Sequence, residues 1–189
     1  MTSSHHLSGT DRLMEVMERE AADGCAADIY VNIQGDEPMV SAAHIDLLIN
    51  GLRAPRDSIG AVQVSTLKVP ASPEAAEDPN AVKVVTDRRG WALYFSRAPI
   101  PCRRDASRQA TYYKHLGFYA YTAAALRQFQ TLAPSPLERT EGLEQLRFLE
   151  NGIPIIVIET SQDTIGVDTE EDLHRVEDYF RERGVGSRE

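Results

Sequence analysis

Residues 28–38 read Asp-Ile-Tyr-Val-Asn-Ile-Gln-Gly-Asp-Glu-Pro, and they set the expectations for the rest of the chain. The segment 28–33 is rich in β-branched and aromatic residues and predicts a short strand that stops at the Gln-Gly pair. Asp36 and Glu37 follow it directly. In open α/β sheets ligands bind beyond the carboxyl ends of strands, where a carboxylate can hold Mg²⁺. A solvated acidic turn is the alternative for the same residues.

Working outward from this segment, apolar patterns alternate between strand and helix periods. Alternation of this kind predicts an α/β domain with a largely parallel sheet. Further strands are expected at 61–67, 81–86, 91–95, 114–121 and 154–159, and helices are expected to begin after Ser8, Ser41, Ser135 and Thr169. The helix after Ser135 is expected to run to Asn151, residues 70–80 to form a surface loop, and Leu173, Val176 and Phe180 to face inward.

Composition excludes several classes of protein. The chain has 189 residues, 42% apolar residues and a net charge of −9, which suits one ordinary domain and argues against a nucleic-acid binder. No apolar run approaches the ~20 residues of a membrane span, and the polar residues after Met1 do not resemble a signal peptide. Cys25 and Cys102 lie far apart and are expected to be reduced thiols, so we expect a cytoplasmic protein.

A second carboxylate, Asp168, stands immediately before Thr169, where a helix is expected to begin. An acidic residue at that place often serves only the helix N-terminus. Together with Asp36 at another strand end, however, it could bind metal ions that neutralise a phosphoryl group under in-line attack.

Other polar side chains are candidates for substrate contacts. His115 and Tyr119 alternate onto one face of an expected strand, which is either a half-buried strand face or a set of polar donors for a hydroxylated acid. Arg97, after an aromatic strand, is either a carboxylate clamp or part of a surface ion pair. Glu144 and Gln145 are expected inside a helix, where such a pair usually faces solvent.

Eight runs of the sequence occur in the order found in one enzyme family. They are residues 6–12, 31–38, 79–85, 92–97, 114–119, 135–138, 143–147 and 166–169. On these runs the chain resembles the CMP-KDO synthetases, the 3-deoxy-manno-octulosonate cytidylyltransferases of Gram-negative bacteria. The resemblance covers nearly the whole chain. It implies a Rossmann-like nucleotidyltransferase fold, in which a mixed sheet carries helices on both faces.

The resemblance also implies a reaction and its residues. The C2 hydroxyl of KDO would attack the α-phosphate of CTP to give CMP-KDO and pyrophosphate for lipopolysaccharide biosynthesis. Asp36 and Asp168 would be catalytic ligands of Mg²⁺. The remaining implied contacts are Ser8, Thr10, Arg12 and Gln34 for the nucleotide, and Arg97, His115, Tyr119, Glu144 and Gln145 for the sugar acid. A homodimer is implied, with no nucleic-acid or membrane partner.

The chain departs from the family pattern at its start. The family begins with a strand and a glycine-rich loop that holds the triphosphate, so residues 1–189 are expected to form a single cytidylyltransferase domain without that segment. A central strand buries apolar side chains worth roughly 8–15 kcal/mol, as much as a typical domain's stability. The chain alone is therefore expected to fold poorly and not to catalyse. The alternatives are a cytidylyltransferase for another acid sugar (the 8-amino analogue of KDO or a sialic acid) and a non-catalytic remnant that only dimerises or binds ligand.

Overall fold

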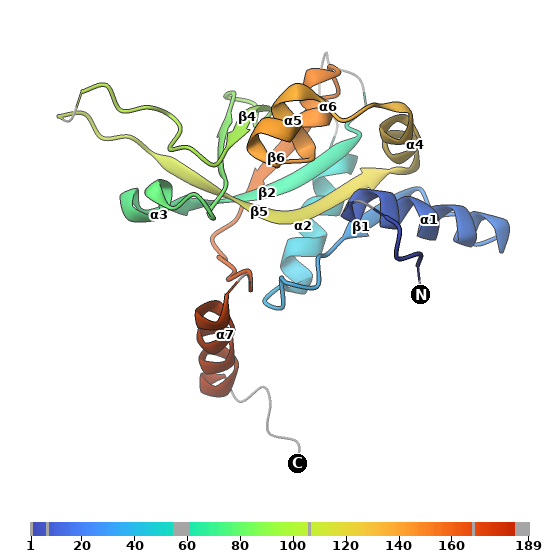
Figure 1. Cartoon of the computed structure of the whole chain (residues 1–189), viewed down its shortest axis with the longest axis horizontal. Helices are drawn as coiled ribbons and strands as arrows, with labels where there is room; N and C mark the ends of the chain where they lie inside the picture. The colour runs from blue at the N-terminus through green and yellow to red at the C-terminus, as the bar shows by residue number, and fades with distance from the viewer. Residues whose placement is uncertain (1, 7, 55–60, 106, 168, 184–189) are drawn as a thin grey trace.

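The computed structural model describes residues 2–6, 8–54, 61–105, 107–167 and 169–183. Helices and strands alternate as the sequence pattern predicts only as far as residue 86; the strands over 83–122 then follow one another, as do the helices over 123–150 (Figure 1). The helices are α1 (Gly9–Ala22), α2 (Ala42–Arg53), α3 (Pro73–Glu77), α4 (Ala123–Thr131), α5 (Pro136–Glu141), α6 (Gln145–Glu150) and α7 (Glu170–Glu182). The strands are β1 (Ile29–Asn32), β2 (Val64–Ala71), β3 (Lys83–Thr86), β4 (Ala92–Ser96), β5 (Tyr112–Thr122) and β6 (Ile155–Glu159).

The long strand β5 organises the sheet. The strand order is β4-β3-β5-β2-β6, and β1 pairs with the end of β5. Only β2 and β6 run parallel among the described strands, and β1, β2 and β3 all pair with β5 in the antiparallel sense. The expectation of a largely parallel sheet was wrong. Strands β3 and β4 form an antiparallel hairpin, and the central strand β5 runs antiparallel to β1, β2 and β3. The mixed sheet implied by the family resemblance is confirmed.

Helices cover both faces of the sheet (Figure 1). One face packs on α1, α4 and α6 through a cluster that includes Met14, Phe129 and Phe148. The other face packs on α2 through a cluster that includes Leu48 and Phe118. The sheet therefore lies between two apolar clusters.

The tip of the β3–β4 hairpin meets the far edge strand. Val157 of β6 donates its backbone N–H to the carbonyl oxygen of Gly90 at 2.8 Å, and Trp91 forms an isolated bridge with Ile156. Gly90 has a φ of +89°, which glycine adopts without the steric cost that a Cβ atom brings. The sheet is therefore curled, so that its two edges approach each other.

Local predictions failed where a glycine or a tertiary contact intervened. The single helix expected to run from Ser135 to Asn151 is two helices, because Gly142 adopts a left-handed conformation (φ +66°) and ends α5. The loop expected at 70–80 contains the end of β2 and the short helix α3, which begins at Pro73. Helix α4 was not anticipated.

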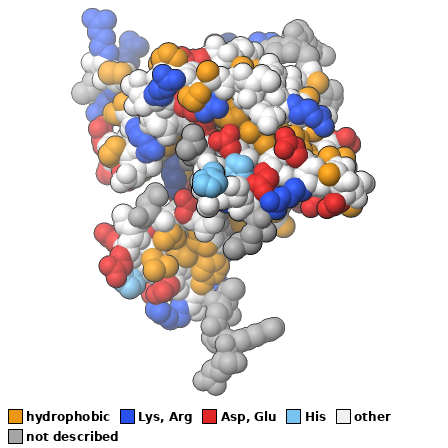
Figure 2. Space-filling model, turned by 45° about the vertical axis from the view of Figure 1, so that its right-hand side comes forward, with side chains coloured by type: hydrophobic (Ala, Val, Ile, Leu, Met, Phe, Trp, Pro, Cys, Tyr) orange, Lys and Arg blue, Asp and Glu red, His pale blue; other side chains and the backbone are white. Residues whose placement is uncertain are grey.

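Helix α7 stands away from the body (Figure 1). Val176 on its inner side is buried, but Leu173 is 43% exposed, so the expectation that Leu173 faces inward was wrong. Hydrophobic side chains are visible on the lower part of the molecule, where α7 lies (Figure 2). Among the described residues, no helix is both long and apolar enough to cross a bilayer.

Candidate active site

A polar cavity of about 730 Å³ opens where β1 and β5 meet the segment that leads from β6 to α7. The loop after β1 contributes Asp36 and Glu37 to its wall, and β5 contributes Lys114, His115 and Tyr119. The α5–α6 turn, the first turns of α7 and Arg97 after β4 also line it. The cavity thus lies at the strand end that the sequence indicated.

Two loops that are far apart in sequence form one wall of the cavity. Val167 donates its backbone N–H to the carbonyl oxygen of Asp36 at 2.8 Å, and Ile165 donates to the sulfur of Met39 at 3.4 Å. The contacts run in opposite chain directions, as in a two-stranded ribbon. They bring the residue before Asp168 against Asp36, whereas Asp168 itself lies outside the described residues.

The same pairing continues into the N-terminus of α2. Ser41 caps this helix, and its hydroxyl hydrogen-bonds the Gln162 side-chain oxygen at 2.9 Å. His44 accepts the Ser41 backbone N–H at its Nδ1 (3.2 Å), while its Nε2 lies 3.1 Å from the Gln162 carbonyl oxygen. A carbonyl can only accept, so Nε2 carries the proton. The loop that leads to α7 is therefore held by side chains as well as by backbone.

Asp36 is exposed on the cavity wall, as expected for a carboxylate that contacts a ligand. Among the described residues, no three His, Cys, Asp or Glu side chains group closely enough to hold a metal ion by themselves. An exposed carboxylate such as that of Asp36 fits Mg²⁺, which usually takes one or two protein carboxylates and completes its shell with water and substrate phosphate.

Glu37 is the main residue that sequence reasoning missed. Its Oε2 atom and the Thr164 hydroxyl are fully buried, and neither has a hydrogen-bond partner of good geometry among the described residues. Burial raises the pKa of Glu37, although the Thr164 hydroxyl, Lys114 and the Gly117 amide act in the opposite direction. A Cβ atom on Gly117 would come within 3.2 Å of Glu37 Oε1, so the missing side chain of Gly117 makes room for this carboxylate.

Lys114 of β5 is a cation in the cavity lining that acts on this acidic wall. Its Nζ donates to Asp163 Oδ1 at 2.9 Å and to the Thr164 carbonyl oxygen at 2.7 Å. The ammonium therefore fixes the β6–α7 segment from the sheet side. Because its side chain keeps 24% exposure, it also presents positive charge to the cavity.

Arg97 lies on the opposite rim and is held by backbone oxygens. Its Nε donates to the Glu141 carbonyl at 3.0 Å and its Nη1 to the Pro79 carbonyl at 3.1 Å. The Glu141 carboxylate in turn accepts the Arg97 backbone N–H at 3.0 Å. Arg97 therefore makes no surface ion pair through its side chain among the described residues, and its guanidinium lines the cavity with donor capacity left over.

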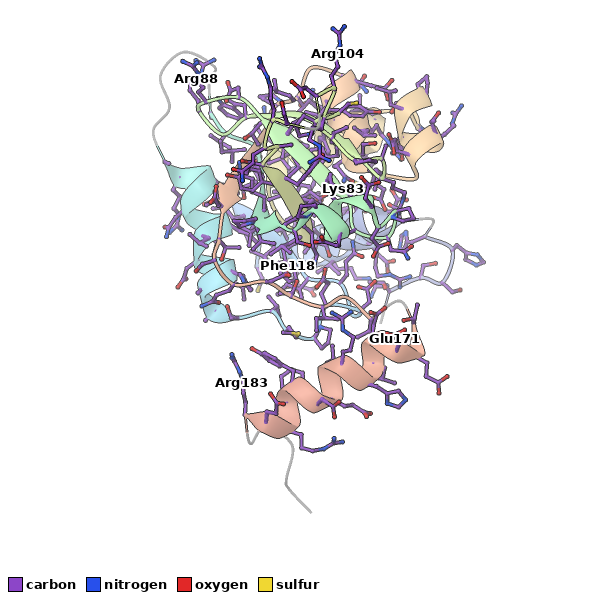
Figure 3. All side chains as sticks on the ribbon, turned by 90° about the vertical axis from the view of Figure 1, so that its left-hand side faces the viewer. Lys83, Arg88, Arg104, Phe118, Glu171 and Arg183 are labelled. Atoms are coloured by element: carbon purple, nitrogen blue, oxygen red, sulfur yellow. The ribbon has the colours of Figure 1, made fainter. Side chains whose placement is uncertain are left out.

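Lys83 of β3, labelled in Figure 3, supports the backbone of Arg97. The side chain is fully buried, and Nζ donates to the carbonyl oxygens of Asp78 (2.7 Å) and Arg97 (2.5 Å). Burial lowers the pKa of Lys83, and the nearby carboxylates offset part of this effect. The lysine fixes the backbone on both sides of the rim.

His115 and Tyr119 do share a face of β5, with ring centroids 5.3 Å apart, and both are less than 8% exposed. The face is buried rather than half-buried. Burial lowers the pKa of His115 to about 3 and raises that of Tyr119 well above its usual value. The imidazole is therefore neutral at pH 7, and the phenol keeps its proton.

Glu144 and Gln145 do not lie inside a continuous helix. Glu144 is the N-cap of α6, and Gln145 in the first turn is only 7% exposed. After the break at Gly142 both residues line the cavity, as the family resemblance implied, rather than lying on a solvent-facing helix surface. Asp172 and Arg175 of α7 also line the cavity, and no motif in the sequence indicated them.

Three of the four candidate nucleotide contacts line a cavity. Thr10 lines the main cavity, and Arg12 lines a smaller adjoining cavity of about 380 Å³. Gln34 lines both cavities. Ser8 lines neither, and its hydroxyl instead caps α1 by accepting the Asp11 backbone N–H at 3.1 Å.

The fold and the site together define a nucleotidyltransferase domain. The fold is a curled mixed sheet with helices on both faces, and the site is a polar cavity between an acidic loop and a basic rim. The family model described as "Cytidylyltransferase" matches residues 1–161, and the chain belongs to this family.

Two relatives within this family are especially similar to the chain. The chain is 53% identical to the 3-deoxy-manno-octulosonate cytidylyltransferase of Koribacter versatilis over 97% of its own length and 66% of that protein. It is 57% identical to the enzyme of the same name from Acidobacterium capsulatum, over 93% of the chain and 68% of the relative. The chain thus spans about two thirds of the length of these two relatives.

A solved structure agrees with the fold. The chain superposes with a TM-score of 0.86 on a CMP:2-keto-3-deoxy-manno-octonic acid synthetase complexed with CTP. Sequence identity is 42%, and the match covers 97% of this chain and 72% of that one.

Proposed function

We propose that the chain takes part in transfer of the cytidylyl group from CTP to 3-deoxy-manno-octulosonate, with release of pyrophosphate. The observation that carries this proposal is the pairing of Val167 with Asp36 at 2.8 Å, which joins the two acidic loops at the cavity. The names of the relatives support the choice of substrates.

The two ends of the cavity suit the two substrates. The acid sugar would bind between Arg97 and the α5–α6 turn, where the Arg97 guanidinium lines the same cavity as Glu144 and Gln145. Arg97 would pair with the sugar carboxylate, because a guanidinium fork matches carboxylate geometry. The hydroxyls of the sugar would meet the carboxylate and amide of Glu144 and Gln145.

The nucleotide would lie toward the smaller cavity. Arg12 and Gln34 line that cavity and Thr10 lines the main one, so these three side chains would contact the nucleotide where the two cavities adjoin. Ser8 would act indirectly, by capping the helix that carries Thr10 and Arg12. This arrangement would bring the α-phosphate near Asp36.

We propose Asp36 and Asp168 as the protein ligands of Mg²⁺. When bound, the ion would supply positive charge to offset the phosphate oxygens during in-line attack. The chain's own contribution would be to hold Asp36 on a loop fixed by the Val167 backbone N–H.

Pyrophosphate release from CTP plus KDO by the purified chain tests the proposal, with equilibrium binding of KDO measured alongside it. Asp36→Asn should abolish metal-dependent CTP binding and leave the affinity for KDO within about twofold, because the sugar contacts lie on the other rim. Glu20→Gln, on the outer side of α1, is the matched control. Failure of the chain to bind KDO would contradict the proposal.

Two alternatives have their own outcomes. Tighter binding of the 8-amino analogue or of a sialic acid than of KDO would favour a different acid sugar. KDO binding without any turnover would favour a non-catalytic remnant.

We also propose a cytoplasmic homodimer, and light scattering of the purified chain tests its oligomeric state. The apolar side chains on α7 support this assembly.

A further inference from the structure

Thr66 of β2 lies against a β-bulge in β5. The pairing register shifts between Thr66 and Leu67, so that β5 has two extra residues opposite this point. The Thr66 side chain is fully buried there. Its hydroxyl oxygen lies 2.7 Å from the Phe118 carbonyl oxygen, 3.3 Å from the Leu116 carbonyl oxygen and 2.8 Å from His115 Nε2.

Counting protons assigns the direction of these contacts. A hydroxyl has one hydrogen to donate, and both carbonyl oxygens can only accept. The Thr66 hydrogen therefore points to the carbonyls, of which that of Phe118 is closer. If Nε2 of His115 took this hydrogen instead, the Phe118 carbonyl would face an oxygen lone pair at 2.7 Å. Nε2 must therefore carry its own hydrogen and donate it to Thr66.

The other ring nitrogen of His115 is left without a hydrogen. Burial lowers the pKa of His115 to about 3, so the neutral ring has only one N–H. Nδ1 makes no hydrogen bond within the described part of the chain, yet it is not among the fully buried atoms that lack a partner. It therefore keeps an accessible edge, and His115 lines the cavity.

The ring has little freedom to change this orientation. It packs edge-on against Phe95, with centroids 5.0 Å apart, and lies 5.3 Å from the ring of Tyr119. Flipping the ring would exchange its nitrogen and carbon positions and break the contact with Thr66. The bulge, the hydroxyl and the aromatic neighbours together select one tautomer.

We propose that Thr66 is a positioning residue that holds His115 in its Nε2–H tautomer, so that Nδ1 accepts a hydrogen bond from a hydroxyl group of the ligand. His115 would then act as an acceptor toward the sugar rather than as a donor. This inference rests on the proposed function for the identity of the ligand, but the tautomer does not depend on it.

The first experiment is ¹⁵N NMR of the full chain labelled at histidine, with His115→Gln used to assign the ring. The wild-type protein should show a protonated Nε2 and a bare Nδ1. Thr66→Val should shift the two nitrogens toward each other as both tautomers become populated, and Thr66→Ser should restore the wild-type pattern. A protonated Nδ1 in the wild type, or an unchanged tautomer in the valine variant, would overturn the inference. The wild-type spectrum decides the tautomer even if that variant fails to fold.

The second experiment adds KDO. Binding should move the Nδ1 resonance, and Thr66→Val should weaken KDO binding by roughly five- to tenfold, with Thr66→Ser close to wild type. CTP binding should be unchanged in both variants. If KDO binds without moving Nδ1, the acceptor role is wrong although the proposed function survives. If KDO does not bind at all, the proposed function and the acceptor role fail together, and the tautomer result stands.

Discussion

Glu138 and Arg147 face each other across the turn that joins α5 and α6. Arg147 Nε donates to Glu138 Oε2 at 2.7 Å, its Nη2 contacts Oε1, and both side chains are only 10% exposed. Although burial alone would raise it, the pKa of Glu138 is lowered by Arg147 and the Ser135 amide. This pair closes the ends of the turn that presents Glu144 to the cavity.

Removing one partner of this pair should be costly. Glu138→Ala leaves a nearly buried guanidinium without its carboxylate and should lower the free energy of unfolding by ~3–5 kcal/mol. Glu150→Ala is the control, since Glu150 is exposed and accepts one backbone N–H from Leu137. That variant should lose only ~1 kcal/mol. Urea denaturation measures both, and equal losses would contradict the role of the pair.

Gly142 should matter for ligand binding as well as for stability. Alanine at its φ of +66° costs ~1–2 kcal/mol, although a Cβ atom would meet open space. Gly24→Ala is matched, because Gly24 also has a positive φ and open surroundings but lies at the end of α1. We expect similar stability losses in both variants and weaker KDO binding only in Gly142→Ala. Equal KDO affinities, measured by calorimetry, would show that the turn does not shape the site.

The contact between Glu37 and Gly117 can be tested by a double-mutant cycle. Gly117→Ala should displace the Glu37 carboxylate, because the new Cβ atom would lie 3.2 Å from Oε1. Its effect on stability and on Mn²⁺ binding, followed by electron paramagnetic resonance, should shrink in a Glu37→Ala background. A coupling energy of ~0.5–3 kcal/mol is typical for residues in contact. Strictly additive effects would mean that Gly117 makes room for some other group.

His115 should make stability depend on pH. Its pKa is about 3 in the folded chain, against ~6.5 in an unfolded one. Between these values the unfolded state binds more protons, so stability falls as pH decreases, by up to ~1.4 kcal/mol per unit. Urea unfolding between pH 7 and pH 4.5 should show a smaller slope for His115→Gln than for the wild type. Parallel pH profiles would contradict the burial of a neutral imidazole.

The sequence predicted features whose physical cause is local. Ser8, Ser41, Ser135 and Thr169 all cap helices, as their side chains and positions indicated. A cap depends on a few consecutive residues, so it can be recognised without the fold. Likewise, the end of β1 did mark the edge of the cavity.

Features that depend on distant residues were missed. Glu37 was seen only as the neighbour of Asp36, because its burial depends on Gly117 and on Thr164, far along the chain. Gly142 differs from these features because its signal is local. A glycine favours the end of a helix, although a continuous helix was expected across this position. A helix that ends at Gly142 leaves Glu144 and Gln145 at the start of the next helix, α6, where they line the cavity.

The ribbon between the loops that follow β1 and β6 has a consequence for the order of folding. Its side-chain contacts join residues 126 positions apart at Ile165 and Met39, and 121 apart at Gln162 and Ser41. Contacts of such long sequence separation bear a large loop-closure entropy and slow the folding of the regions that contain them. The acidic wall should therefore form after the helices and the β3–β4 hairpin, so that the newly folded domain acquires its binding site last.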